Sequence, residues 1–255
     1  MIKNFYQKEL IISATQQRTG APVRKDILKI QSWLVLYEMS NPGAGTLTSI
    51  DGEFGPATEQ AVKNFQRLNR LPVNGVVDQK LFSRMSDPLK QAFETIPPGT
   101  NLRQLVVNTA IQHLSQHPFE LIINKESNSG PWVRSYMDGH EGESWFWCMG
   151  FVQAIIDQAT AAMGKSYKTL MPPTYSCDTG GSFALTQKNL VRSPKLRSNP
   201  ELVKPGDIFL IQKSSFDWIH TGIVVKSGSE TIESIEGNTN SMGSRNGNAV
   251  FRRVR

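Results

Sequence analysis

A cysteine and a histidine are the residues of this chain whose types best suit chemistry. Cys148 stands where a loop of Gly and acidic residues gives way to an apolar run typical of a helix. A helix start or a neighbouring imidazolium lowers a cysteine pKa from its usual value of about 8.5, which supplies the thiolate that attacks carbonyl carbon. His220 precedes a β-branched run at 221–225 that predicts a half-buried strand. The two residues suit a thiol nucleophile and its general base.

The strands around His220 can bring a third group to the imidazole. A strand expected at 208–211 predicts an antiparallel pair with the strand of His220. A further strand, expected over residues 231–236, is followed by a Gly and then by Asn238. Glu236 and Asn238 are two apart and can share one face of an extended segment, where a carboxylate or an amide orients the imidazole. Both candidates stay open, since Asn238 also fits a loop at a strand end.

Several motifs in this order resemble the CHAP class of cysteine amidohydrolase/peptidases. The resemblance covers about residues 101 to 255. It is carried by the segments 128–136, 147–152, 205–207, 220–224 and 236–239. It implies a papain-like α+β domain, with N-terminal helices and an antiparallel sheet, that cuts amide bonds in peptidoglycan.

The resemblance also implies roles for the residues singled out above. Cys148 attacks the amide carbonyl, and His220 takes and returns the proton. Glu236 or Asn238 holds the ring. A tetrahedral oxyanion then collapses to an acyl-enzyme that water clears, with the backbone N–H of Cys148 as one oxyanion donor. We expect no cofactor.

A second set of motifs fills the N-terminal third of the chain. Residues 27–34 and 57–68 place apolar side chains on one helical face around a glycine-rich connector at 50–58, and residues 79–85 fit a short third helix. The region 23–88 resembles a three-helix peptidoglycan-binding domain. The matching residues are Asp51, Gly52, Phe54, Gly55, Pro56, Thr58, Ala61, Val62, Phe65, Gln66, Val73, Gly75 and Val77. The alternative is a generic helical spacer.

The pattern of breaks divides the chain into four parts. We expect an N-terminal extension at 1–22, the peptidoglycan-binding domain at 23–95, a linker at 96–100 and the CHAP-like domain at 101–255. Two adjacent prolines make the linker semi-rigid. With 255 residues and 38% hydrophobic composition, each domain is expected to hold its own core.

Charge and hydropathy limit the partners. The net charge of +6 is spread along the chain without a basic aromatic patch, so we expect peptidoglycan and no nucleic acid as a partner. No segment approaches the ~18 apolar residues of a membrane span, and no signal-peptide core is visible near Met1. We therefore expect a monomer made in the cytoplasm that reaches the cell wall or periplasm by phage lysis or by a secretion machine, with an immunity or delivery protein as a further partner. The basic run 252–255 is expected to be a solvated strand end.

Cysteine and histidine usage carries two further expectations. A disulfide between Cys148 and Cys177 would consume the nucleophile, so we expect both thiols to be reduced and Cys177 to be an ordinary buried thiol. His113 and His117 lack a zinc-protease spacing and are expected on a helix surface. The acidic residues before Cys148 do not fit a calcium loop, so no metal is expected there. These residues are Asp138, Glu141 and Glu143.

Three functional alternatives remain open from the residues. The protein could be a catalytically inactive wall-binding protein, or an acyltransferase or transpeptidase that passes the acyl group to an amine. If it is a hydrolase, the bond could be the N-acetylmuramoyl-L-alanine amide or a peptide bond of the stem or cross-bridge. Tryptophans near the nucleophile are expected to divide between groove and core. They are Trp132, Trp145 and Trp147.

Overall fold

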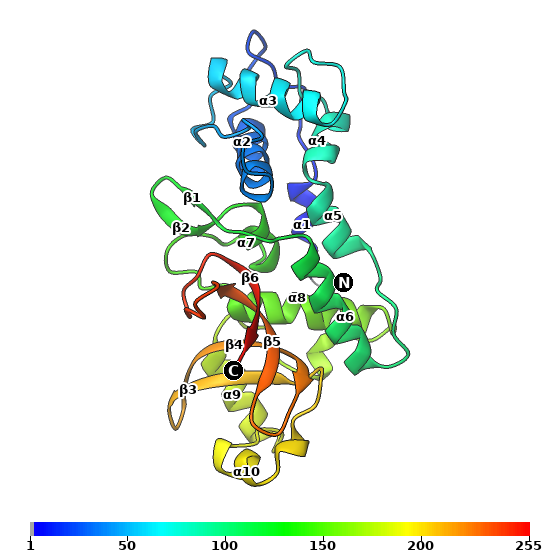
Figure 1. Cartoon of the computed structure of the whole chain (residues 1–255), viewed down its shortest axis with the longest axis vertical. Coiled ribbons are helices and arrows are strands. Elements are labelled where there is room, and N and C mark those ends of the chain that lie inside the picture. Colours follow the sequence, from blue (N-terminus) through cyan, green and yellow to red (C-terminus); the bar gives the residue numbers. More distant parts are fainter. Residues whose placement is uncertain (1–2) are drawn as a thin grey trace.

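The computed structural model describes residues 3–255 and combines a helical unit with a unit of helices and antiparallel strands (Figure 1). This confirms the predicted α+β class. The N-terminal helices are α1 (Tyr6–Glu9), α2 (Arg24–Ser40), α3 (Pro56–Leu68), α4 (Gln79–Met85) and α5 (Asp87–Glu94). The remaining helices are α6 (Leu102–Ser115), α7 (Pro131–Tyr136), α8 (Cys148–Ala161), α9 (Cys177–Thr186) and α10 (Ser193–Ser198). Short 3-10 turns cover Tyr167–Thr169 and Pro200–Leu202.

The helical unit forms as its sequence pattern predicts. The apolar stripe of α2 is buried, and a side-chain oxygen of Asp78 caps α4 by accepting from the Leu81 N–H at 2.7 Å. Gln31, with no exposed surface, accepts from the backbone N–H groups of Asp51 and Gly52. This amide fixes the turn between α2 and α3, which explains why a polar residue sits on the buried face.

The second unit is built on a sheet with strand order β3-β4-β5-β6. The strands are β3 (Ile208–Ser214), β4 (Asp217–Ser227), β5 (Ile232–Thr239) and β6 (Ala249–Val254), and a separate hairpin joins β1 (Leu121–Ile123) to β2 (Glu126–Ser129). Helix α8 packs against β4 and β5, and α9 packs against β4. The strands expected at 208–211 and 231–236 are confirmed, and β6 ends within the basic run 252–255, where a strand end was expected.

His113 corrects one expectation. It lies on α6 with no exposed surface, between the Tyr136 hydroxyl and the Gln158 amide, each 2.9 Å from a ring nitrogen. Burial lowers its pKa to about 4, so the ring stays neutral at physiological pH. The prediction of a surface position was wrong because the two polar partners that permit burial are distant in sequence.

The N-terminal segment joins the two units. Lys3 is buried; its backbone N–H donates to Asp157 at 3.0 Å and its ammonium donates to the Tyr136 carbonyl at 2.8 Å. Glu9 of α1 makes paired hydrogen bonds with Arg134 of α7 at 2.7 and 2.9 Å. The segment then reaches the helical unit, where Gln16 bridges to Val77. Residues 3–16 therefore contact both units, and we call this segment the strap.

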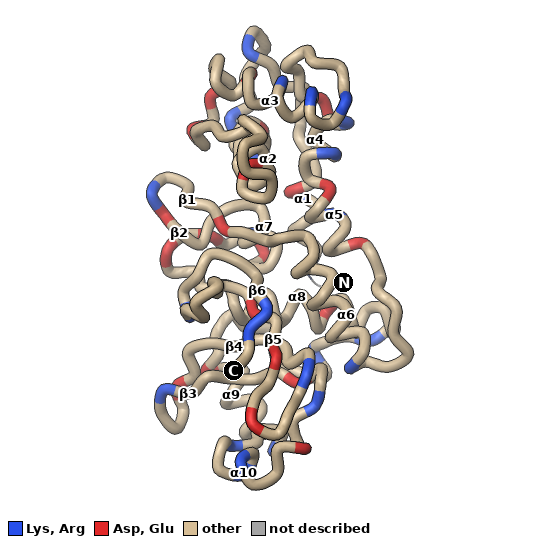
Figure 2. The backbone as a smooth tube through the Cα atoms, in the orientation of Figure 1, with Lys and Arg blue, Asp and Glu red and all other residues tan. Residues whose placement is uncertain are grey.

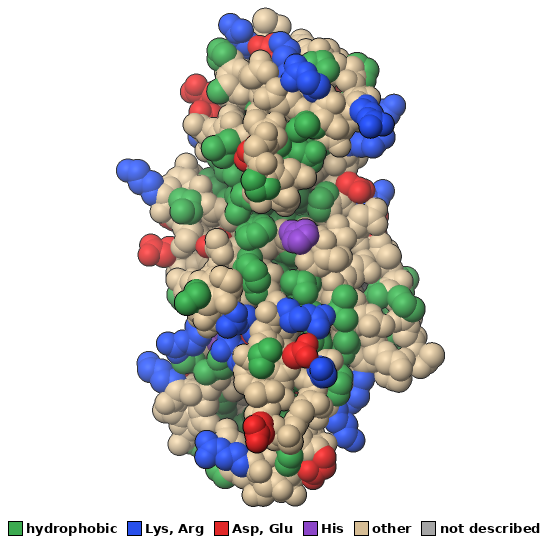
Figure 3. Space-filling view, viewed as in Figure 1, with side chains coloured by type: hydrophobic (Ala, Val, Ile, Leu, Met, Phe, Trp, Pro, Cys, Tyr) green, Lys and Arg blue, Asp and Glu red, His purple; other side chains and the backbone are tan. Residues whose placement is uncertain are grey.

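The buried apolar side chains form one continuous cluster rather than the two separate cores that we expected. Trp33 of α2 meets Trp132 of α7 edge-on, with ring centroids 6.1 Å apart, and Tyr6 stacks on Phe93 of α5 at 4.6 Å. Figure 3 shows apolar side chains gathered across the middle of one face, where the units meet. The strap and α5 fill the junction between the two units. The sequence pattern of each region taken alone does not predict this shared packing.

Charged residues are interspersed along the whole backbone (Figure 2). Several pair locally, as Lys63 does with Glu59 and Arg252 with Glu233. Within residues 3–255, none of the helices is long and apolar enough to cross a bilayer.

The shared core generates a prediction about unfolding. Trp33→Ala should cost about 3–5 kcal/mol, because it removes a large side chain that is only 2% exposed and leaves a cavity at the junction. Calorimetry should show a single transition at a lower temperature. Leu47→Ala, at a side chain that is 69% exposed, is the matched control and should cost less than about 0.5 kcal/mol. Two separate transitions, with only the helical unit destabilised, would contradict the shared core.

Candidate active site

Cys148 is the first residue of α8, as its sequence context predicts. The residue before it, Trp147, provides no side-chain cap, and its carbonyl accepts the Phe151 N–H at 2.9 Å. The first N–H groups of the helix therefore remain available beside the sulfur, where the positive end of the helix dipole favours a thiolate.

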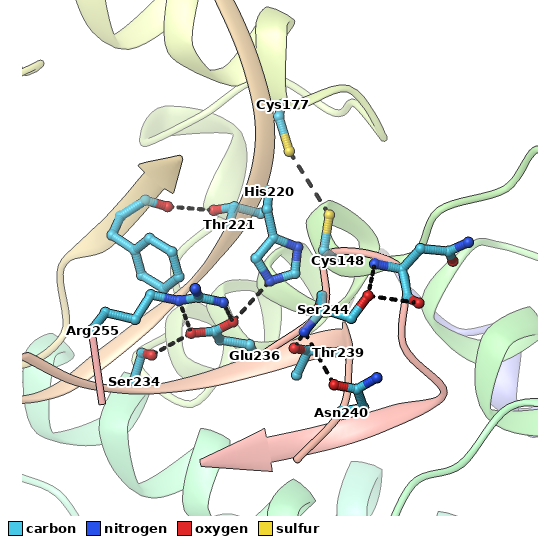
Figure 4. A network of polar contacts seen from close by, with 12 residues as sticks. Cys148, Cys177, His220, Thr221, Ser234, Glu236, Thr239, Asn240, Ser244 and Arg255 are labelled. Atoms are coloured by element: carbon cyan, nitrogen blue, oxygen red, sulfur yellow. Dashed lines mark hydrogen bonds and ion pairs between the residues drawn. The ribbon is translucent and has the colours of Figure 1, made fainter. Parts of the chain in front are cut away.

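His220 and Glu236 meet on neighbouring strands. The Nε2 atom of His220 on β4 lies 2.9 Å from a carboxylate oxygen of Glu236 on β5, and both side chains are fully buried. Figure 4 shows the imidazole between this carboxylate and Cys148. Its Nδ1 atom faces the sulfur and has no hydrogen-bond partner of normal geometry among the residues that the structure describes. The sequence-predicted cysteine, histidine and glutamate are thus brought together.

Three further contacts hold Glu236. Arg255 donates from Nε to one carboxylate oxygen at 2.7 Å and from Nη2 to the other at 2.5 Å. The Ser234 hydroxyl donates to the carboxylate at 2.5 Å. The Arg255 guanidinium also lies over the Phe209 ring, 5.7 Å from its centroid. The carboxylate is therefore fixed in both position and charge, and the expectation that 252–255 is a solvated strand end was wrong for Arg255.

Two glycines make room for this arrangement. A Cβ atom on Gly222 would lie 2.7 Å from Cγ of Glu236, so its absence leaves the space that the carboxylate side chain fills. A Cβ atom on Gly237 would lie 2.6 Å from Phe151 and 2.9 Å from Trp147. The lack of a side chain there lets β5 approach the start of α8, which brings Glu236 and Cys148 into one site.

Electrostatics favour a thiolate paired with an imidazolium. The hydrogen bond from Cys177 and the contact with His220 outweigh burial and lower the pKa of Cys148 to about 5. Burial alone would lower the pKa of His220, but its contacts with Cys148 and Glu236 raise it to about 8. Against the effect of burial, bonds from Arg255, His220 and Ser234 lower the pKa of Glu236 to about 2. Between about pH 5 and about pH 8 the pair is charged.

Cys177, which we expected to be an ordinary buried thiol, contacts Cys148. It is the first residue of α9, and its sulfur lies 3.8 Å from that of Cys148. Both thiols are free. The hydrogen bond to Cys148, with burial, raises the pKa of Cys177, so Cys177 stays protonated and donates a hydrogen bond to the Cys148 thiolate.

Asn238 is placed differently from Glu236. The register of β5 with β6 shifts between Glu236 and Thr239, and Asn238 has a left-handed backbone with φ of 54°. This bulge interrupts the alternation that would place the two candidates on one face. The Asn238 side chain is fully buried, and neither of its polar atoms has a partner within the described part of the chain.

The three tryptophans divide between core and surface. Trp132 and Trp147 are buried, and the Trp147 indole N–H donates to Glu120 at 2.9 Å. Trp145 is half-buried and stacks on His140, with ring centroids 4.1 Å apart. Of these three tryptophans, Trp145 is the one that keeps part of its surface exposed.

Acidic residues before Cys148 are engaged by the protein itself. Asp138 accepts from Lys3 and from the Tyr175 hydroxyl, and Glu141 accepts from Arg134 at 2.7 Å. Over the described residues, no cluster of His, Cys, Asp and Glu has the arrangement of a metal site.

Sequence reasoning missed Arg255, Ser234 and Cys177 as members of the site. Ser234 lies two residues before Glu236 on the same strand, which was the available signal. Arg255 and Cys177 carried no such signal, because their places depend on β6 and α9 folding back onto β5 and α8.

Comparison with known proteins adds one family. Residues 23–85 match the family described as "Putative peptidoglycan binding domain". The match confirms the resemblance of the helical unit and associates the chain with peptidoglycan. No curated protein and no solved structure matches the chain.

The charged pair generates a prediction about thiol reactivity. Alkylation of Cys148 by iodoacetamide should rise with pH through a midpoint of about 5, because only the thiolate reacts. His220→Ala should move the midpoint upward, since the positive partner is lost. Peptide mass mapping after timed quenching assigns the modified cysteine. A midpoint near the usual cysteine value in the unaltered protein would contradict the ion pair.

The buried carboxylate generates a prediction about stability. Arg255→Met should destabilise the protein by about 3 kcal/mol, because it leaves a buried charge without its main partner. Arg252→Met is the matched control, since Arg252 pairs with Glu233 on the surface, and it should cost less than about 1 kcal/mol. Denaturant unfolding at neutral pH measures both. Equal costs would show that Glu236 does not depend on Arg255.

Proposed function

We propose that this protein is a cysteine hydrolase that cuts amide bonds in peptidoglycan. The observation that carries the proposal is the buried Cys148, His220 and Glu236 set, whose charges favour a nucleophilic thiolate. The helical unit supplies the substrate class, because it matches a peptidoglycan-binding family. The resemblance of residues 101–255 to CHAP enzymes agrees with both.

The chemistry follows from the positions of these groups. The Cys148 thiolate attacks the amide carbonyl carbon, and the His220 imidazolium gives its proton to the leaving amine. The neutral imidazole then takes a proton from water, whose oxygen attacks the acyl-enzyme and releases the new carboxylate. Glu236 holds the ring through Nε2 and stabilises its charge, while Nδ1 faces the reacting atoms.

The oxyanion needs donors at the start of α8. The uncapped helix start offers backbone N–H groups beside Cys148. We assign the second donor to the amide of Asn238, since a buried amide without a partner calls for a ligand. Asn238 follows Gly237, which lies against Trp147 and Phe151 on either side of the nucleophile.

Two other functions compete with this proposal. A transferase on the same scaffold would pass the acyl group to an amine, and a wall-binding protein would use only the helical unit. The bond is an N-acetylmuramoyl-L-alanine amide or a peptide bond of the stem or cross-bridge. The protein would work as a phage endolysin or as an injected antibacterial effector, monomeric, with a delivery or immunity protein as partner.

Digestion of purified peptidoglycan tests the proposal. The unaltered protein should release fragments with new carboxylates, whose masses name the bond, and Cys148→Ala should release none while still pelleting with the wall. The rate should be bell-shaped in pH, rising through about 5 as Cys148 ionises and falling through about 8 as His220 loses its proton. New amides in the presence of added amines would indicate a transferase. Wall binding without fragments from either protein would indicate a binding protein.

A glycine variant isolates the oxyanion donor in the same assay. Asn238→Gly removes the amide yet tolerates the left-handed backbone at this position. We expect kcat to fall by about 10²–10³ with an unchanged pH profile. An unchanged kcat would exclude the amide from the oxyanion site.

A further inference from the structure

Cys177 has no step in the proposed hydrolysis, yet its sulfur directly contacts that of the nucleophile. We propose that Cys148 and Cys177 form a reversible two-thiol redox site, in which a hydroperoxide oxidises the pair to a disulfide. The loss of hydrolysis in the oxidised state rests on the proposed function, whereas formation of the disulfide does not.

The geometry brings the sulfurs within reach of a bond. They lie 3.8 Å apart, and a disulfide bond measures about 2.05 Å, so a side-chain rotation with a small backbone adjustment must close the difference. Figure 4 shows the two thiols pointing toward one another, joined by the dashed line of this contact. Both sulfurs are at helix starts, and the lowered pKa of Cys148 makes it the thiolate that reacts first with an oxidant.

Cys177 is held in place by the strand that carries His220. The Asp178 carboxylate accepts from the Trp218 N–H of β4 at 2.6 Å, and the Ser176 hydroxyl caps α9 by accepting from Thr179 at 3.3 Å. The bond to Trp218 therefore anchors the first turn of α9 to β4, and the cap fixes the start of the helix. This anchoring distinguishes Cys177 from a thiol that merely fills the core.

The first oxidation step uses the pair that activates the nucleophile. The Cys148 thiolate attacks the terminal peroxide oxygen, the O–O bond breaks, and the departing alkoxide or hydroxide takes a proton from the His220 imidazolium. Cys148 becomes a neutral sulfenic acid. The negative charge that kept the neighbouring Cys177 protonated is then gone.

The second step closes the bond. The Cys177 sulfur attacks the sulfenic sulfur, the S–O bond breaks, and the leaving hydroxide takes the Cys177 proton and departs as water. The net reaction converts two thiols and one hydroperoxide into a disulfide, water and an alcohol, or a second water if the oxidant is hydrogen peroxide. The sulfenic acid is trapped before a second oxidant makes an irreversible sulfinic acid, and a dithiol reductant restores both thiols.

Stepwise oxidation with hydrogen peroxide tests the site by mass. The unaltered protein should lose about 2 Da, and non-reducing peptide mapping should join the peptides of Cys148 and Cys177. Peptidoglycan hydrolysis should be lost in parallel and return after dithiothreitol. Cys177→Ser should instead gain about 32 Da at Cys148 and should not recover.

The readouts separate the two proposals. If the protein is not a hydrolase, no fragments appear in any redox state, but the mass loss still occurs. If the unaltered protein gains oxygen at Cys148 as fast as Cys177→Ser and never loses hydrogen, the redox site is overturned. Circular dichroism of Cys177→Ser and Cys177→Ala checks that both variants fold. If both are unstable, the mass change of the unaltered protein still shows whether the disulfide forms.

Discussion

Burial of an ionised carboxylate costs folding free energy unless both of its oxygens accept hydrogen bonds. The site depends on such hydrogen bonds to Glu236. Its two oxygens accept hydrogen bonds from Arg255, Ser234 and His220, and these bonds keep the carboxylate ionised. An ionised Glu236 stabilises an imidazolium, and the imidazolium stabilises the Cys148 thiolate. These charged groups form a series from Arg255, which follows β6, through Glu236 on β5 and His220 on β4 to Cys148 at the start of α8. Loss of Arg255 would therefore change the charge at the sulfur.

The local patterns of the sequence predicted the parts of the site that lie within single elements. The apolar run after Cys148 predicted α8, and the β-branched run after His220 predicted β4, because periodicity reports the burial of one face. Glu236, with Asn238 as the alternative, followed from its place at the end of the strand expected over residues 231–236. Cys148, His220 and a choice of two residues for the third position could therefore be proposed without knowledge of the fold.

The contacts between distant elements could not be predicted in this way. Arg255 reads as a surface charge until β6 pairs with β5, and Cys177 reads as a small buried side chain until α9 meets α8. His113 is a similar case, since its burial requires Tyr136 and Gln158. A buried polar group needs hydrogen-bond partners, and a single sequence does not identify them. An apolar face, by contrast, can be recognised from the spacing of its residues alone.

The strap has a consequence for the modularity of the chain. Lys3 and Glu9 bind Asp157 and Arg134, so the first described residues belong structurally to the unit that also contains Arg255. The helical unit is thus inserted into the other unit rather than appended to it. A cut at 96–100 would therefore separate Lys3 and Glu9 from the residues that they bind. An exchange of the peptidoglycan-binding region in this protein would need two junctions, one on each side of the matched residues 23–85.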